Sequence, residues 1–179
     1  MFNFWKRRNN QKKAIEKMYK AVVEQARRPI FYQSLGVPDT ADGRFDLILL
    51  HAFLVHYRIK DEQGAIQCGQ ALFDHSFREF DKALREMGVG DLKVPRQMKH
   101  MMKSYKGRLV SYADAMDNNK SATDIKEALA RNLYRKNSEI DVNVLVVMER
   151  YLKDNVEYLG EQSWQDISAG QIEFKEPKL

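Results

Sequence analysis

The chain has 179 residues, a length typical of one domain; 44% of them are hydrophobic and 31% are charged. Only 9 Gly and 4 Pro interrupt it, so we expect an all-α single-domain bundle of about six helices with a short irregular C-terminal tail. The single cysteine, Cys68, excludes an internal disulfide and a cysteine-based zinc site, which fits a reducing compartment.

Nothing in the sequence resembles a membrane span or an export signal. No stretch has the roughly 20 apolar residues that cross a bilayer. The apolar segment and small-residue cleavage site of a secretory signal are also missing from the sequence. We therefore expect a cytoplasmic protein.

The net charge of +5 is unevenly distributed along the chain. Residues 1–28 contain nine Lys or Arg against two Glu, a net charge of +7 that leaves −2 for the remainder. Because the body of the protein has no basic excess, we expect no broad nucleic-acid surface there and no DNA partner.

Residues 1–11 are predicted to form a flexible arm before a helical domain over residues 12–179. The arm sets three aromatic side chains beside three cations, which suits peripheral contact with the inner face of an anionic cytoplasmic membrane. Ribosomal RNA is a second possible partner, because phosphates attract cations without any base-reading motif. A disordered, solubilising terminus is a third interpretation. The contact residues would be Phe2, Phe4, Trp5, Lys6, Arg7 and Arg8.

Helical spacing of apolar residues predicts a first helix from Lys12 to just before Pro29. Residues 29–36 should be irregular or form one helical turn, and residues 37–43 a loop that caps the next helix. That second helix, 44–60, is apolar around most of its circumference and should lie at the centre of the bundle. A third helix, 62–87, should end at a left-handed Gly88. Its inward face would carry Ile66, Phe73, Phe77, Phe80, Leu84 and Met87.

Pro95 is predicted to open a fourth helix that runs to Met116. A fifth should begin at a capping box of Ser121 with Asp124 and continue to about Tyr134. The sixth, 141–159, should stop at Gly160. The tail after it should add a helical turn around Trp164 and an extended stretch over 171–175.

Groups that could support catalysis do not converge in this sequence. His51 and His56 are five residues apart, about 140° around a helix, so they cannot bind one metal ion together. The Gly88-Val89-Gly90 stretch joins two helices, which is the wrong context for a dinucleotide site. Phosphate loops and nucleophile elbows are absent from the sequence. We expect a non-enzyme with no catalytic residues, no metal, no cofactor and no small-molecule substrate.

Arg44, His51 and Arg58 recur every seven residues along the second helix and share one side of it within about 40°. One interpretation is a solvent edge, or a set of ion pairs with acidic neighbours. The functional interpretation is that this polar stripe borders a groove for a client segment, since arginine among apolar side chains is common at binding hot spots.

The fourth helix carries a second candidate surface. Its methionines are flexible and polarizable, so any exposed ones could accept apolar segments of different shape. The alternative is that this stripe belongs to the core. The residues proposed for client contact on this helix are Met98, Met101, Met102, Lys103 and Arg108.

Residues 36–51 and 84–91, together with Gln25-Ala26-Arg27, Phe31-Tyr32 and Gly107-Arg108, form an ordered set of motifs. They resemble the ubiquinol-cytochrome c chaperone family, the assembly factors of the respiratory ubiquinol-cytochrome c reductase. The resemblance runs from about Met18 to Met116.

This resemblance implies a non-enzymatic chaperone that holds newly made cytochrome b until the reductase is assembled. The resemblance also implies two further partners, because in mitochondrial relatives the family's role is linked to the ribosome and to a small partner protein. The alternative function is a helical module that binds RNA or the ribosome through its basic N-terminal region. Binding to phosphates should weaken steeply with salt, whereas an apolar contact with a client should not.

Overall fold

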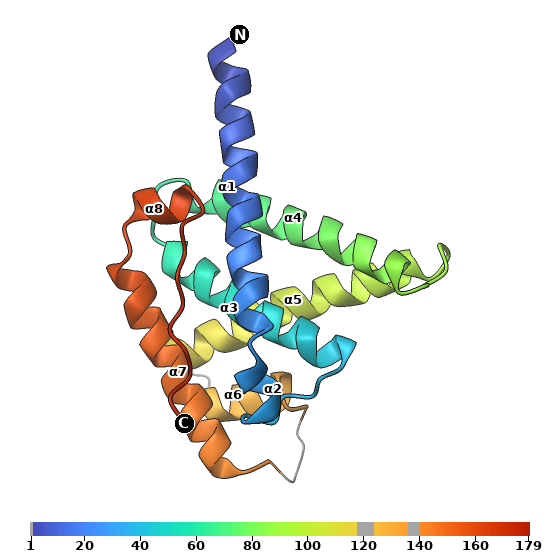
Figure 1. Ribbon diagram of the computed structural model, residues 1–179, viewed down its shortest axis with the longest axis vertical. Helices are drawn as coiled ribbons and strands as arrows, with labels where there is room; N and C mark the ends of the chain where they lie inside the picture. The colour runs from blue at the N-terminus through green and yellow to red at the C-terminus, as the bar shows by residue number, and fades with distance from the viewer. Residues whose placement is uncertain (1, 118–123, 136–139) are drawn as a thin grey trace.

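The computed structural model describes residues 2–117, 124–135 and 140–179, and this part of the chain is helical without strands (Figure 1). The all-α prediction is therefore confirmed. This part of the chain contains the six predicted helices and two additional short ones, α2 and α8. These two lie where single helical turns were predicted. The elements are α1 (Phe2–Ala26), α2 (Pro29–Gln33), α3 (Ala41–Ile59), α4 (Ala65–Glu86), α5 (Val94–Met116), α6 (Ile125–Asn132), α7 (Val142–Glu161) and α8 (Trp164–Ser168).

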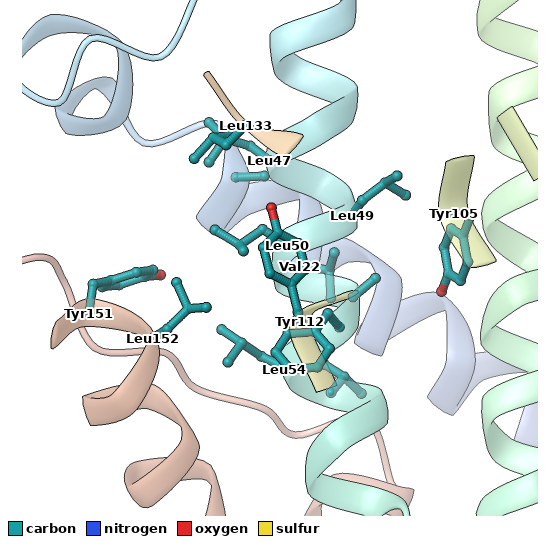
Figure 2. Close-up of a cluster of buried hydrophobic side chains, with 14 of the residues drawn as sticks. Val22, Leu47, Leu49, Leu50, Leu54, Tyr105, Tyr112, Leu133, Tyr151 and Leu152 are labelled. Carbon is teal, nitrogen blue, oxygen red and sulfur yellow. The ribbon is translucent and has the colours of Figure 1, made fainter. Parts of the chain in front are cut away.

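Helix α3 lies at the centre of the bundle, as its apolar circumference predicted, and it contacts α1, α4, α5 and α7. Leu47, Leu50 and Leu54 follow one another along it and are fully buried (Figure 2). Tyr112 of α5 and Tyr151 of α7 pack around it in the same core. Helix α3 therefore serves as the central element against which α1, α4, α5 and α7 are positioned.

Helices α4 and α5 form an antiparallel pair whose connecting turn lies far from the rest of the molecule (Figure 1). The middle of α4 packs as predicted, with Phe77 and Phe80 buried. Its two ends do not, because Ile66 is 84% exposed and Met87 is also exposed. Both were predicted to face inward, but Ile66 in the first turn and Met87 just after the helix are not covered by neighbouring side chains, whereas Leu84 in the last turn is buried.

Helix α1 begins at Phe2, so residues 2–11, which were predicted to form a flexible arm, are helical. Neither Pro nor Gly interrupts residues 2–26, and extending a helix costs far less than starting one. Residues 9–13 of α1 are exposed, and Ala14 and Ile15, which follow them, are buried. The beginning of α1 accordingly projects beyond the other helices (Figure 1).

Two other boundaries differ from the sequence prediction. Helix α7 continues through Gly160 to Glu161, so this glycine does not stop the helix. Helix α6 is capped by Asp124, whose side chain accepts a hydrogen bond from the Lys126 amide. The predicted cap Ser121 lies outside the described residues. After α8 the tail is irregular, and Asn155 of α7 holds it by accepting the Lys175 amide at 2.9 Å.

Gly88 has φ +81, which confirms the left-handed cap after α4. Its amide donates to the Arg85 carbonyl, and the Val89 amide donates to the Leu84 carbonyl, both at 3.0 Å. These two bonds form a Schellman motif that closes the end of the helix.

Replacing Gly88 by Ala should lower the free energy of unfolding by about 1 kcal/mol, because alanine is strained at positive φ. Open space surrounds the site, so no clash adds to this cost. Gly160 is the matched control: it is helical, its surroundings are also open, and Gly160→Ala should raise stability by about 0.5 to 1 kcal/mol. Urea denaturation of both variants measures the difference, and equal midpoints would contradict it.

Candidate binding site

The motif around residues 38–46 forms the start of α3. The Thr40 side chain caps the helix by accepting the Gly43 amide at 3.1 Å. A Cβ at Gly43 would lie 2.0 Å from the Pro38 carbonyl oxygen, so only glycine fits there. Arg44 is exposed and pairs with Asp39 at 2.7 Å. These contacts give the motif an architectural explanation.

Asp46, the next charged residue of this motif, joins three elements. Its fully buried carboxylate lies 2.7 Å from Arg108 Nη2 on α5 and 3.1 Å from Arg135 Nη2, after α6. Arg135 Nη1 also reaches Asp42 at 2.9 Å. Burial raises the pKa of Asp46 to about 6, although both arginines act in the opposite direction. Arg108 therefore stabilises the core, which gives it a structural role, and its role in client contact stays a prediction.

His51 is buried between α3, α7 and the tail, and it cannot border an open groove as predicted. Its Nδ1 atom lies 2.8 Å from the Leu47 carbonyl oxygen, so Nδ1 carries the proton. Nε2 then accepts from the Tyr151 hydroxyl at 2.7 Å, and that hydroxyl accepts from Gln25 Nε2 at 3.0 Å. This chain of bonds requires a neutral ring, and burial accordingly lowers the pKa of His51 to about 4.

Arg58 also has a structural role. Its Nε donates to the Leu159 carbonyl at 2.7 Å and its Nη2 to the Gln162 carbonyl at 2.9 Å. These carbonyls lie at the end of α7, where a cation is favourable. Glu62 accepts from Nη1 at 2.6 Å. The three predicted stripe residues thus occupy three separate environments and do not border one common groove within the part of the chain that the structure describes.

The methionines of α5 divide into two groups. Met98 and Met101 are half-buried against the core, as the core interpretation of this stripe expected. Met102 is 39% exposed and Lys103 is exposed. Only this pair, among the candidate residues on α5, reaches an open surface that an apolar client could touch.

A groove that sequence reasoning missed runs between α4 and α5. It consists of two hollows of about 430 Å³ and 420 Å³, and Phe73 lines both of them. Phe77 and Met102 line the first, while Ile66 and Leu109 line the second. The sequence feature that could have predicted this groove is the high density of aromatic and aliphatic residues on α4. We assigned those residues to the core. We call these five residues, with their hollows, the α4–α5 groove.

His56 stands at the base of this groove and is positioned by Tyr105. The His56 Nε2 atom lies 2.8 Å from the Tyr105 hydroxyl, and burial lowers the pKa of His56 to about 4. His51 and His56 thus bind hydroxyl groups on different helices. Among the described residues, no cluster of three or more His, Cys, Asp or Glu side chains could hold a metal ion.

A larger hollow, about 840 Å³, lies between α1 and α4. Asp74 and Arg78 line both this hollow and the first hollow of the α4–α5 groove. This hollow is the more hydrophilic of the two because Asn9, Gln11 and Lys12 line it as well. An apolar segment would leave these polar groups without water, which is unfavourable. The α4–α5 groove is therefore the better candidate for an apolar ligand.

Fold and site together define an all-α protein with an apolar interhelical groove and buried polar networks that serve its architecture. Across the part of the chain that the structure describes, no helix is both long and apolar enough to span a membrane. A family model described as ubiquinol-cytochrome C chaperone matches residues 33–174. The chain belongs to this family, which confirms the predicted resemblance and extends it well past Met116.

Solved and curated relatives agree with this assignment. The crystal structure of the Cbp3 homolog from Brucella abortus is 30% identical, covers 98% of this chain and 97% of that chain, and superimposes with a TM-score of 0.82. Ubiquinol-cytochrome-c reductase complex assembly factor 1 of Xenopus laevis is 23% identical over 93% of this chain and 80% of its own length. The Mus musculus protein of that name is also 23% identical, over 89% of this chain and 54% of its own.

Proposed function

We propose that this protein is a non-enzymatic chaperone for assembly of ubiquinol-cytochrome c reductase, and that its client is newly synthesised cytochrome b. Membership of the chaperone family and the names of the curated relatives support the assembly role. The observation that carries the proposal is the α4–α5 groove, a largely apolar surface that is open to solvent.

The groove has the composition needed to hold an apolar helix. Phe73 and Leu109 line it, and Ile66 and Met102 lie at its exposed ends. Amphipathic or apolar helices bind such grooves through side chains spaced one turn apart. A methionine at the rim adapts to different side chains at small cost. Of the client residues proposed from the sequence, Met102 and Lys103 remain candidates, and exposed Arg44 would lie outside this groove.

The N-terminal residues Phe2, Phe4, Trp5, Lys6, Arg7 and Arg8 remain our proposed contact with an anionic membrane or with RNA. A membrane contact would place the protein peripherally on the inner face of the cytoplasmic membrane. The charge of +7 over residues 1–28 also favours a second candidate function, binding to ribosomal RNA. A steep loss of binding with rising salt would support RNA as the partner.

Deleting the gene should lower assembled reductase and cytochrome b, with a smaller effect on other respiratory enzymes, because an unprotected apolar client aggregates or is degraded. Wild-type protein should restore both. Ile66→Glu with Met102→Glu should fail to restore them, since burying carboxylates against an apolar client should weaken binding at least about tenfold. Quantifying assembled reductase in each strain measures this.

Val142→Glu with Val146→Glu is the matched control. These valines are also exposed but lie on α7, so the pair adds the same charge away from the groove and should restore the reductase fully. Normal reductase in the deletion strain would refute the chaperone function. Full restoration by the Ile66 and Met102 pair would refute only the groove as the client site.

A further inference from the structure

The outer face of α5 carries a row of cations. Arg96, Lys99, Lys103 and Lys106 fall within about 80° of one another, opposite the buried Tyr105 and Tyr112. Among the described residues, none of the four forms an ion pair with a carboxylate, and the sequence has neither Asp nor Glu from Leu92 to Ala113. The row therefore presents uncompensated positive charge.

Exposed aliphatic side chains bracket these cations. Leu92, in the turn before α5, is 97% exposed, and Val110, one turn beyond Lys106, is 59% exposed. Val110 follows the same helical spacing as the four cations, and Leu92 lies in the turn that leads into the helix. Single exposed apolar residues are ordinary, but one at each end of a row of four cations gives the combination of charge and apolar surface that is typical of an interfacial contact. We call residues 92, 96, 99, 103, 106 and 110 the α5 outer stripe.

We propose that the α5 outer stripe docks this protein on an anionic lipid bilayer. The cations contact the headgroup phosphates, and Leu92 enters the boundary between headgroups and acyl chains. Leu92 is well placed for this because its turn lies at the far end of the α4 and α5 pair (Figure 1). RNA fits less well, because phosphates would contact the cations but would give the exposed Leu92 and Val110 no apolar surroundings.

Docking through this stripe goes beyond the proposed function and uses residues outside the N-terminal segment. Lys106 belongs to the stripe and also lines the α4–α5 groove. A docked α5 therefore places the groove at the membrane surface, where an apolar client would emerge. This last step alone rests on the proposed function.

Vesicle co-sedimentation tests the cations. The full-length protein should bind vesicles of phosphatidylcholine and phosphatidylglycerol and not vesicles of phosphatidylcholine alone. Arg96→Gln, Lys99→Gln and Lys103→Gln together should weaken binding about a hundredfold, since each cation near the surface contributes about fivefold. Arg150→Gln, Lys153→Gln and Lys178→Gln remove the same charge elsewhere and should leave binding within about threefold of wild type. Equal binding by the two triple variants would overturn the proposal.

A fluorescent label tests insertion of Leu92. An environment-sensitive dye on Leu92→Cys, in a Cys68→Ser background, should shift to the blue with the anionic vesicles, and the same dye on Val142→Cys should not. An unshifted dye at residue 92 would overturn insertion. If the α5 triple variant loses binding to an RNA homopolymer while keeping vesicle binding, the stripe is an RNA surface and the lipid proposal fails.

A truncated protein tests docking through the α5 outer stripe independently of the proposed N-terminal contact. Protein without residues 1–11 should still bind the anionic vesicles, and the α5 triple substitution should still weaken that binding about a hundredfold. Complete loss on truncation alone would overturn the stripe as a docking surface. Neither result bears on the client groove, which the reductase measurement tests through Ile66 and Met102.

Discussion

Replacing Arg108 by Gln should lower the free energy of unfolding by about 3 kcal/mol, because it takes the nearest cation from a buried carboxylate. Asp46 is fully buried and Arg108 is 16% exposed, so water cannot replace the lost charge. The Asp46 Oδ1 atom, which faces Arg108, accepts no hydrogen bond from the described residues. The Arg108 guanidinium, 2.7 Å away, compensates the charge on this oxygen, while Arg135 contacts the other oxygen, Oδ2, at 3.1 Å. Urea denaturation near neutral pH measures the loss.

The exposed pair Arg44 and Asp39 provides the control. It has the same 2.7 Å separation, but both side chains are more than half exposed, so Arg44→Gln should leave stability nearly unchanged. Asp46→Asn combined with Arg108→Gln should be more stable than Arg108→Gln alone, because the core then no longer holds a carboxylate that has lost one of its two arginine partners. If Arg108→Gln and Arg44→Gln cost the same, the Asp46 contact does not stabilise the fold.

The architecture could be predicted because it depends on patterns within single segments. The apolar circumference of 44–60 predicted the central position of α3, and Gly88 predicted the end of α4. Errors at the ends had local causes. A glycine ends a helix when it adopts a positive φ, and Gly160 does not adopt one. At the other end of the chain, residues 2–11 contain no helix-breaking residue, so α1 starts earlier than predicted.

The site could not be predicted in the same way, because it depends on contacts between distant segments. A helical repeat places Arg44, His51 and Arg58 on one side of a helix but does not say what covers that side. The middle residue, His51, is buried because Tyr151, 100 residues away in the sequence, packs against it and forms a hydrogen bond with it. Ile66 shows the reverse: its spacing predicted burial, and its exposure depends on where neighbouring helices end.

Acidification should destabilise the wild-type protein through His51. Burial lowers the pKa of His51 from 6.5 to about 4, so the unfolded chain binds a proton near pH 6.5 while the folded chain does not. Stability linked to this group is therefore complete above pH 6.5 and declines as the pH falls towards 4. The loss from His51 alone should be about 2.5 kcal/mol between pH 7 and pH 4.5.

Comparison with His51→Gln isolates this contribution. Glutamine does not titrate, so this variant should be less stable than wild type at pH 7 but should lose about 2.5 kcal/mol less between pH 7 and pH 4.5. His56, whose pKa is also lowered to about 4, titrates alike in both proteins, as does Asp46, whose raised pKa acts in the opposite direction. Urea denaturation of both proteins across this pH range measures the two slopes. If stability depended on pH equally in both proteins, His51 would bind its second ring proton as readily in the folded chain as in the unfolded one. The hydrogen bonds from Tyr151 to Nε2 and from Nδ1 to Leu47 do not allow this, because they occupy both ring nitrogens of a neutral histidine.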